Sequence, residues 1–205
     1  MGAFEYRQAE EIRDAFARHG VRYLFIGKSG AILLGFPDTT QDADLFVEKS
    51  PGNGRAIVVA LRELGFDLDD EQAAQIERGK DFVQLKNGPF DLDLVFAPDG
   101  IEHFAAAWRR RVEVEGFSVC HPDDIIASKE ASGRAKDLES LPRLRSFRET
   151  RGERHEEQQR AASHAGNSPP ASVPTRAPMC RRAASVSWRP REVRSRKPSR
   201  MRCGS

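Results

Sequence analysis

The chain has 205 residues, of which 33 are Lys or Arg and 31 are Asp or Glu, a length that suits one ordinary domain with some chain left over. No segment approaches the roughly 18 apolar residues of a membrane-spanning helix, and the first residues lack the basic-then-apolar pattern of a secretory signal, so we expect a cytoplasmic protein. Cys120, Cys180 and Cys203 are too far apart to suggest a disulfide framework or a metal site.

Charge divides the chain into two parts. Residues 151–205 hold 13 basic and 4 acidic side chains, whereas residues 1–150 hold 20 basic and 27 acidic ones. From residue 161 onward there is no Leu, Ile or Phe, so that segment cannot bury enough apolar surface to offset its ordering entropy. We expect one domain over 1–150 and a disordered Arg/Ser/Pro-rich tail over 151–205. The tail is either a basic arm that contacts nucleic acid weakly or an extension without a function.

Apolar periodicity in the first 150 residues predicts short strands that alternate with helices. The expected helices cover 4–19, 31–34, 54–64, 101–108 and the chain from 123 onward, and the expected strands cover 21–26, 42–47, 82–85, 90–96 and 112–119. A Lys-Asn-Gly-Pro turn at 86–89 predicts a hairpin. This order predicts an α/β (α+β) fold with a small mixed β-sheet flanked by helices.

A glycine-containing turn, Gly27-Lys28-Ser29-Gly30, follows the first predicted strand. Small residues at a strand–helix turn allow backbone N–H groups to approach a phosphate, although glycine there often serves turn geometry alone. The spacing differs from that of a P-loop.

Two Asp-x-Asp pairs lie on predicted strands, Asp42-Ala43-Asp44 and Asp91-Leu92-Asp93. Alternation along a strand places both carboxylates of a pair on one face, where they repel each other unless a cation lies between them. Mg²⁺ prefers such oxygen ligands together with substrate phosphates. Each pair alone could be the solvated side of a strand, but together they can supply three carboxylates to one phosphoryl-transfer site.

The order of these motifs resembles that of the DNA polymerase β-type nucleotidyltransferase superfamily. Residues 25–45 are similar to the segment GGxAxxxHGxPRxTxDxDL of its small bacterial branch, which includes minimal nucleotidyltransferases and abortive-infection-type toxins. Residues 128–138 are similar to the K-x-x-A-G-R-x-K-D-L segment of the same branch.

The resemblance implies a nucleotidyltransferase fold and Mg²⁺-dependent transfer of a nucleoside monophosphate from an NTP to a hydroxyl of an RNA end, a protein or a small molecule. It also implies a possible toxin–antitoxin setting with a partner protein. The implied ligands of two Mg²⁺ ions are Asp42, Asp44 and Asp93, with Asp91 as the alternate third carboxylate, and the implied nucleotide-binding residues are Gly27, Lys28, Ser29 and Lys129.

Three residues depart from the branch's pattern. Lys28 replaces a small residue of the turn, Asp38 stands where Arg is common, and Ser140 stands where a second acidic residue usually follows the K-D-L segment. A negative charge at Asp38 opposes nucleotide binding. Two alternatives to an active enzyme therefore stay open: a catalytically silent nucleotide- or partner-binding module of the same fold, and a nucleic-acid-binding protein that acts through its tail.

Overall fold

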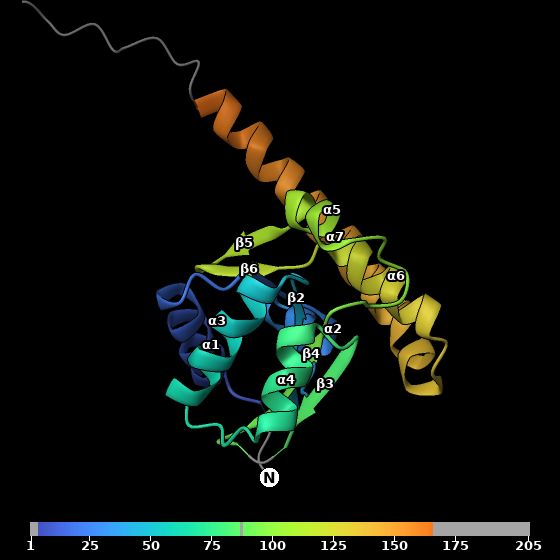
Figure 1. Ribbon diagram of the computed structural model, residues 1–205. Coiled ribbons are helices and arrows are strands. Elements are labelled where there is room, and N and C mark those ends of the chain that lie inside the picture. The colour runs from blue at the N-terminus through green and yellow to red at the C-terminus, as the bar shows by residue number, and fades with distance from the viewer. Residues whose placement is uncertain (1–3, 87, 166–205) are drawn as a thin grey trace, which may run out of the picture. The chain divides into compact units, whose positions relative to one another are not determined.

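A computed structural model of the protein describes residues 4–86 and 88–165 (Figure 1). These residues form a mixed α/β domain, which confirms the expected fold class. Its elements are α1 (Tyr6–Arg18), β1 (Tyr23–Phe25), α2 (Gly27–Leu33), β2 (Asp42–Val47), α3 (Pro51–Glu63), α4 (Asp70–Arg78), β3 (Phe82–Leu85), β4 (Asp91–Val95), α5 (Phe104–Arg110), β5 (Val112–Val114), β6 (Phe117–Val119), α6 (Pro122–Ser132) and α7 (Ala135–Ala165).

One mixed sheet contains the six strands in the order β3-β4-β2-β1-β6-β5. The central pairs β2–β4 and β1–β6 are parallel, β1–β2 is antiparallel, and the predicted β3–β4 hairpin is antiparallel as well. In the β2–β4 ladder Asp42 pairs with Asp91 and Asp44 pairs with Asp93. Paired residues of neighbouring strands point to the same face, so this register places all four carboxylates on one side of the sheet.

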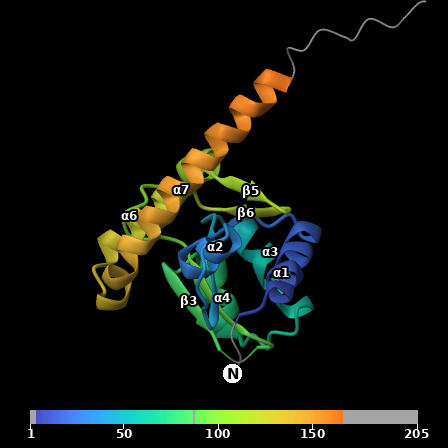
Figure 2. The same ribbon diagram turned by 180° about the vertical axis from the view of Figure 1, so that it is seen from behind.

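Helices lie on both faces of this sheet, as Figures 1 and 2 show together. Helices α3 and α4 cover one face, with α1 packed against α3, whereas α2, α6 and α7 lie on the other. Phenylalanines fill much of the core: Phe16, Phe25, Phe46 and Phe117 are almost fully buried. The carboxylate face of β2 and β4 looks toward the α2–α6–α7 side, where the cavity described below opens.

Several boundaries differ from those expected from the sequence. The segment 112–119, predicted as one strand, is the β5–β6 hairpin, because Glu115 and Gly116 turn the chain with φ of 50° and 81°. The glycine turn at 27–30 forms the first turn of α2. Helix α4 was not predicted, because among its residues only Ile76 is buried and no apolar stripe marks it. Its start is fixed instead by a capping box between Asp69 and Gln72.

Helix α7 continues to Ala165, so the chain is helical beyond residue 150, where the tail was expected to begin. The sequence from 151 to 165 is rich in Arg, Glu, Gln and Ala, which have high helix propensity even without an apolar stripe. The rest of the expected tail, 166–205, lies outside the described residues. Within the described ranges, no helix has the length and apolar character needed to cross a lipid bilayer.

Candidate metal and nucleotide site

Three carboxylates lie close together on one face of the sheet. Asp42 and Asp44 come from β2 and Asp93 comes from β4, and each offers one oxygen within 4.8 Å of the others. The parallel β2–β4 register produces this cluster, because it places Asp93 directly opposite Asp44. The structure therefore brings together the three residues that the sequence singled out as metal ligands, with Asp93 rather than Asp91 as the third.

Asp44 lies against the first turn of α2. Gly27 has φ of 62°, and a Cβ at this position would lie 2.8 Å from Asp44 Cγ, so only glycine leaves room for the carboxylate. Burial, followed by the charges of Asp42 and Asp93, raises the pKa of Asp44 to about 7, against a hydrogen bond from the Lys28 backbone N–H that favours the ionised form.

Ser29 secures the backbone of the same residue. Its side chain is fully buried, its Oγ accepts the Asp44 backbone N–H at 2.9 Å, and the hydroxyl donates to the Ile26 carbonyl at 3.1 Å. The structure thus places Ser29 beneath the carboxylates, whereas the sequence resemblance implied that it contacts a phosphate. Its role here is to join α2 to β2.

The other two carboxylates also have orienting partners. Thr40 Oγ1 donates to Asp42 Oδ1 at 2.8 Å, and Gln84 Nε2 donates to Asp93 Oδ1 at 3.1 Å. Burial raises the pKa of Asp93, while the Gln84 hydrogen bond opposes that rise. Each partner occupies one carboxylate oxygen and leaves the second for another ligand.

Asp91 lies on the same face but outside the cluster of three. It is buried, its Oδ2 lies 3.5 Å from Lys86 Nζ, and its Oδ1 has no hydrogen-bond partner among the described residues. It does not line the cavity. Asp91 is therefore a matched control for Asp93.

A cavity of about 360 Å³ opens over the three carboxylates. Its sheet side carries the three carboxylates, and its helix side carries four cations together with Asp137, the partner of Lys129. The cations come from α2, α6 and the α6–α7 junction: Lys28, Lys129, Arg134 and Lys136. A polyanion that bridges the two sides would meet cations along one wall and a divalent cation, where one is bound, along the other.

Lys129 projects into this cavity from α6 and forms a buried ion pair. Its Nζ lies 2.6 Å from Asp137 Oδ1, and Ser132 Oγ donates to Asp137 Oδ2 at 2.9 Å. Burial works against ionised Asp137, but the hydrogen bonds from Lys129 and Ser132 outweigh it, so the pKa of Asp137 is lowered. The Lys129 charge also lowers the pKa of Asp44, against the larger effects of burial, Asp42 and Asp93.

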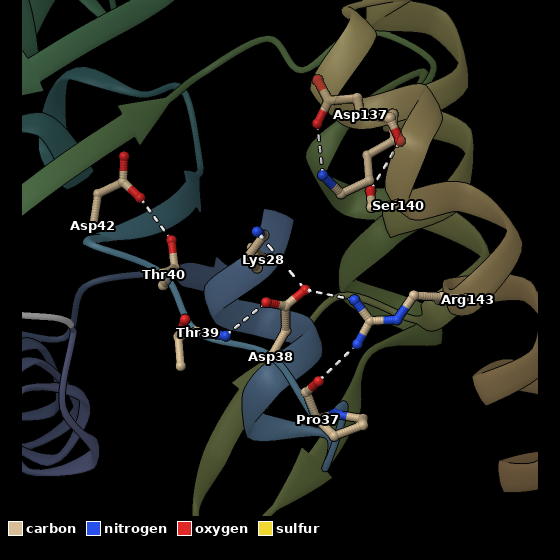
Figure 3. Close-up of polar contacts among 10 residues, drawn as sticks. Lys28, Pro37, Asp38, Thr39, Thr40, Asp42, Asp137, Ser140 and Arg143 are labelled. Atoms are coloured by element: carbon tan, nitrogen blue, oxygen red, sulfur yellow. Dashed lines mark hydrogen bonds and ion pairs between the residues drawn. The ribbon is translucent and has the colours of Figure 1, made fainter.

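Figure 3 shows the surroundings of the residues that depart from the family pattern. Asp38 lies between two cations, with its Oδ2 at 3.8 Å from Lys28 Nζ and 3.5 Å from Arg143 Nη1. Its negative charge is therefore paired with two cations. Ser140 donates to the Asp137 carbonyl at 2.9 Å, inside α7.

Sequence reasoning did not identify the residues that orient the site. Gln84 could have been found, because in a β3–β4 hairpin it lies opposite Asp93 and shares its face. Thr40 also matches the threonine of the family segment, although no role was assigned to it. Asp137 is the aspartate of the K-D-L segment, although no role was assigned to it. Arg143 gave no local signal, because its partners lie in a distant segment.

Comparison with known proteins gives limited similarity. No protein-family model matches the chain, and no curated protein matches it. Among solved structures, the chain is similar to the solution structure of the antibiotic-resistance factor ANT(2'')-Ia, an aminoglycoside nucleotidyltransferase, with a TM-score of 0.44 and 15% sequence identity. The match covers 78% of this chain and 100% of the other. Because this likeness is weak, we base the function on the chain's own residues.

Proposed function

We propose that the protein is a nucleotidyltransferase that uses a divalent cation to move a nucleoside monophosphate from an NTP to the hydroxyl of an acceptor. The observation that carries the proposal is the meeting of Asp42, Asp44 and Asp93 in a cavity whose opposite wall is cationic. We include a cytoplasmic location in this proposal, because NTPs are available there.

The three carboxylates fit a hard divalent cation such as Mg²⁺. The ligand set is all oxygen and its atoms lie within 4.8 Å. Hydrogen bonds from Thr40 and Gln84 orient the carboxylates of Asp42 and Asp93, and Ser29 fixes the backbone of Asp44. Burial, and then the charges of Asp42 and Asp93, raise the pKa of Asp44, so a cation that favours its ionised form would offset both effects. When bound, Mg²⁺ would supply charge neutralisation for the triphosphate and for the pyrophosphate that leaves.

The side chains around the cavity then have distinct tasks. Lys129 and Lys28 face the phosphates as point charges, and Asp93 accepts the proton of the acceptor hydroxyl. The acceptor oxygen forms a bond to the α-phosphorus, the bond between that phosphorus and the α,β-bridging oxygen breaks, and pyrophosphate leaves with the electron pair. Positioning and charge neutralisation account for the catalysis, without a covalent enzyme intermediate.

Label transfer tests this reaction directly. The full chain is incubated with Mg²⁺ and with NTP labelled at either the α- or the γ-phosphate, together with fractionated bacterial RNA, protein or small molecules as acceptors. We expect the α-label in one acceptor fraction and the γ-label in pyrophosphate. That fraction identifies the acceptor class and shows whether a partner protein, such as an antitoxin, is modified.

Asp93→Asn and Asp91→Asn form a matched pair for this assay, because both residues are buried carboxylates two positions apart on β4. Asp93→Asn should lower transfer by about a hundredfold or more, as expected for the loss of a general base, whereas Asp91→Asn should retain most of it. Mg²⁺-dependent NTP binding without transfer to any fraction would instead support the silent nucleotide-binding module. Transfer of the γ-label to an acceptor would contradict nucleotidyl transfer.

A further inference from the structure

Lys28 is a cavity-lining cation whose present contact is loose. It comes from the first turn of α2, and its side chain is 38% exposed. Its Nζ lies 3.8 Å from Asp38 Oδ2, which is an ion pair but too long for a hydrogen bond. An ion pair of this length and exposure contributes little to stability, so Lys28 can leave Asp38 at low cost.

Asp38 has further contacts besides Lys28, with the next residue of its own loop and with α7. Its side chain is only 19% exposed, and its Oδ1 accepts the Thr39 backbone N–H at 2.8 Å. Arg143 Nη1 lies 3.5 Å from Oδ2, and Arg143 Nη2 donates to the Pro37 carbonyl at 2.9 Å. Figure 3 shows Arg143 reaching this loop from α7, on the opposite side of Asp38 from Lys28.

Arg143 is itself fixed in place. Its guanidinium lies over the ring of Phe36, 5.1 Å from the centroid, and Phe36 packs edge-to-face on Phe147 of α7 at 5.5 Å. Arg143 can therefore stay beside Asp38 whether or not Lys28 does. Arg143 thus has two contacts that do not depend on Asp38, whereas the Lys28 ammonium has no such contact among the described residues.

From this asymmetry we propose that Lys28 exchanges partners when a polyphosphate binds, moving its ammonium from Asp38 to a phosphate oxygen while Arg143 retains Asp38. The ligand class is the triphosphate of the NTP, so the inference rests on the proposed function. Lys28 is then a phosphate-binding residue, and Asp38 is a positioning residue that holds the ammonium at the cavity and competes with the phosphate for it. The exchange is favourable because a phosphate oxygen offers a charge-assisted hydrogen bond that the 3.8 Å contact lacks.

The test is a double-mutant cycle on the full chain, read by calorimetric titration with MgATP and, separately, with magnesium tripolyphosphate. Lys28→Met should weaken the binding of both ligands by about tenfold, since it removes a charged hydrogen-bond donor. Asp38→Asn should strengthen both by about threefold, because Lys28 no longer has to leave a charged partner. In the Lys28→Met background, Asp38→Asn should change the affinity by less than about twofold.

Each departure from this pattern has a definite meaning. Unchanged affinity in Lys28→Met would show that Lys28 does not bind phosphate and would overturn the inference. An equal gain in affinity from Asp38→Asn in both backgrounds would show that Asp38 repels the phosphates directly and not through Lys28, which would contradict the partner exchange. If Lys28→Met weakened MgATP but not tripolyphosphate, Lys28 would contact the nucleoside, which also contradicts the proposal.

Two controls distinguish a failure of the partner exchange from a failure of the proposed function. Lys80→Met removes a surface lysine that donates to Gln75 and does not line the cavity, so it should leave both affinities unchanged. Thermal unfolding of every variant confirms that the fold is retained. Absence of MgATP binding by the wild-type chain would count against the proposed function itself, whereas wild-type binding that is indifferent to Lys28 would count against the partner exchange alone.

Discussion

Asp44 is the residue on which burial and like charge act most strongly in this site. Its pKa is raised to about 7, from an ordinary value of 3.8, by burial and by Asp42 and Asp93. The folded state therefore binds the Asp44 proton more tightly than the unfolded state between pH 4 and pH 7. In the absence of a divalent cation, this residue makes the free energy of unfolding fall as pH rises through that window.

The first prediction compares wild type with Asp44→Asn in denaturant unfolding with EDTA at pH 5, 6 and 7. The wild type should lose up to about 1.4 kcal/mol per pH unit more than the variant does, the limit for one titrating group. Millimolar Mg²⁺ should reduce this loss in the wild type only, because the cation favours the ionised carboxylate. Parallel pH profiles for the two proteins would show that the Asp44 pKa is not raised.

A second residue-scale prediction concerns Gly27, whose backbone is left-handed and whose missing Cβ makes room for Asp44. Gly20 is the matched control, because its φ of 65° is similar but a Cβ there would meet nothing within 4 Å. Gly20→Ala should cost about 1–2 kcal/mol from the left-handed backbone alone. Gly27→Ala should cost about 2 kcal/mol more, since Asp44 must shift, and should also weaken Mg²⁺ binding. Equal losses in thermal unfolding would contradict a close packing of Gly27 on Asp44.

At the scale of elements, the α6–α7 junction places a cation over the sheet. Helix α6 ends at Gly133 in a left-handed conformation, and α7 begins two residues later, so Lys129 and Asp137 meet across the turn. A buried ion pair is weak evidence for stability, because desolvation offsets much of its attraction. We therefore expect this pair to matter chiefly for the position of Lys129.

The third prediction compares Asp137→Asn with Asp124→Asn. Asp124 is, like Asp137, a buried carboxylate, but it lies on α6, pairs with Arg110 and does not line the cavity. Asp137→Asn should lower the free energy of unfolding by about 1–3 kcal/mol, because it leaves the largely buried Lys129 ammonium without its partner. Asp124→Asn should lower it by less, because Arg110 is half exposed and can bind water instead. Only Asp137→Asn should weaken MgATP binding, by about fivefold, since Lys129 loses the group that orients it. A similar affinity loss in both variants would assign the Lys129–Asp137 pair a purely structural role.

The elements also show what local sequence can and cannot predict. Alternation with a period of two was enough to place Asp42 with Asp44 and Asp91 with Asp93 on common faces. The choice of Asp93 as the third ligand followed from the family resemblance, because the β2–β4 register places Asp91 and Asp93 on the same face. The structure separates the two, since Asp93 lines the cavity with Asp42 and Asp44 and Asp91 does not. Helix α4 was missed because its evidence is a capping box rather than an apolar stripe.

Contacts between distant segments account for the rest of what was not predicted. The pairing of Asp38 with Arg143 joins residues 105 positions apart, and Ser29 meets Asp44 only because α2 folds back on β2. No local pattern encodes such contacts. The sequence therefore suggested a repulsive Asp38 and a phosphate-binding Ser29, whereas the structure pairs the first and buries the second.

At the scale of the whole molecule, the chain combines an acidic first part with a strongly basic end. Residues 166–205 contain ten basic side chains and one acidic side chain, whereas the candidate site draws all its residues from 26–137. The fourth prediction follows from this separation. Removal of residues 166–205 should leave Mg²⁺-dependent NTP binding unchanged, and any binding of the full chain to RNA should weaken steeply with salt and disappear in the truncated chain. Loss of NTP binding on truncation would contradict a site contained in the described domain.

The central claim is that Asp42, Asp44 and Asp93 form a divalent-cation site that binds an NTP. Calorimetric titration of the full chain with each NTP, in Mg²⁺ and in EDTA, tests it most directly, with Asp42→Asn/Asp44→Asn as the comparison. The account predicts binding that requires Mg²⁺ and is lost in the double variant while the fold is retained. Equal binding with and without Mg²⁺, or no binding by the folded wild-type protein, would contradict it.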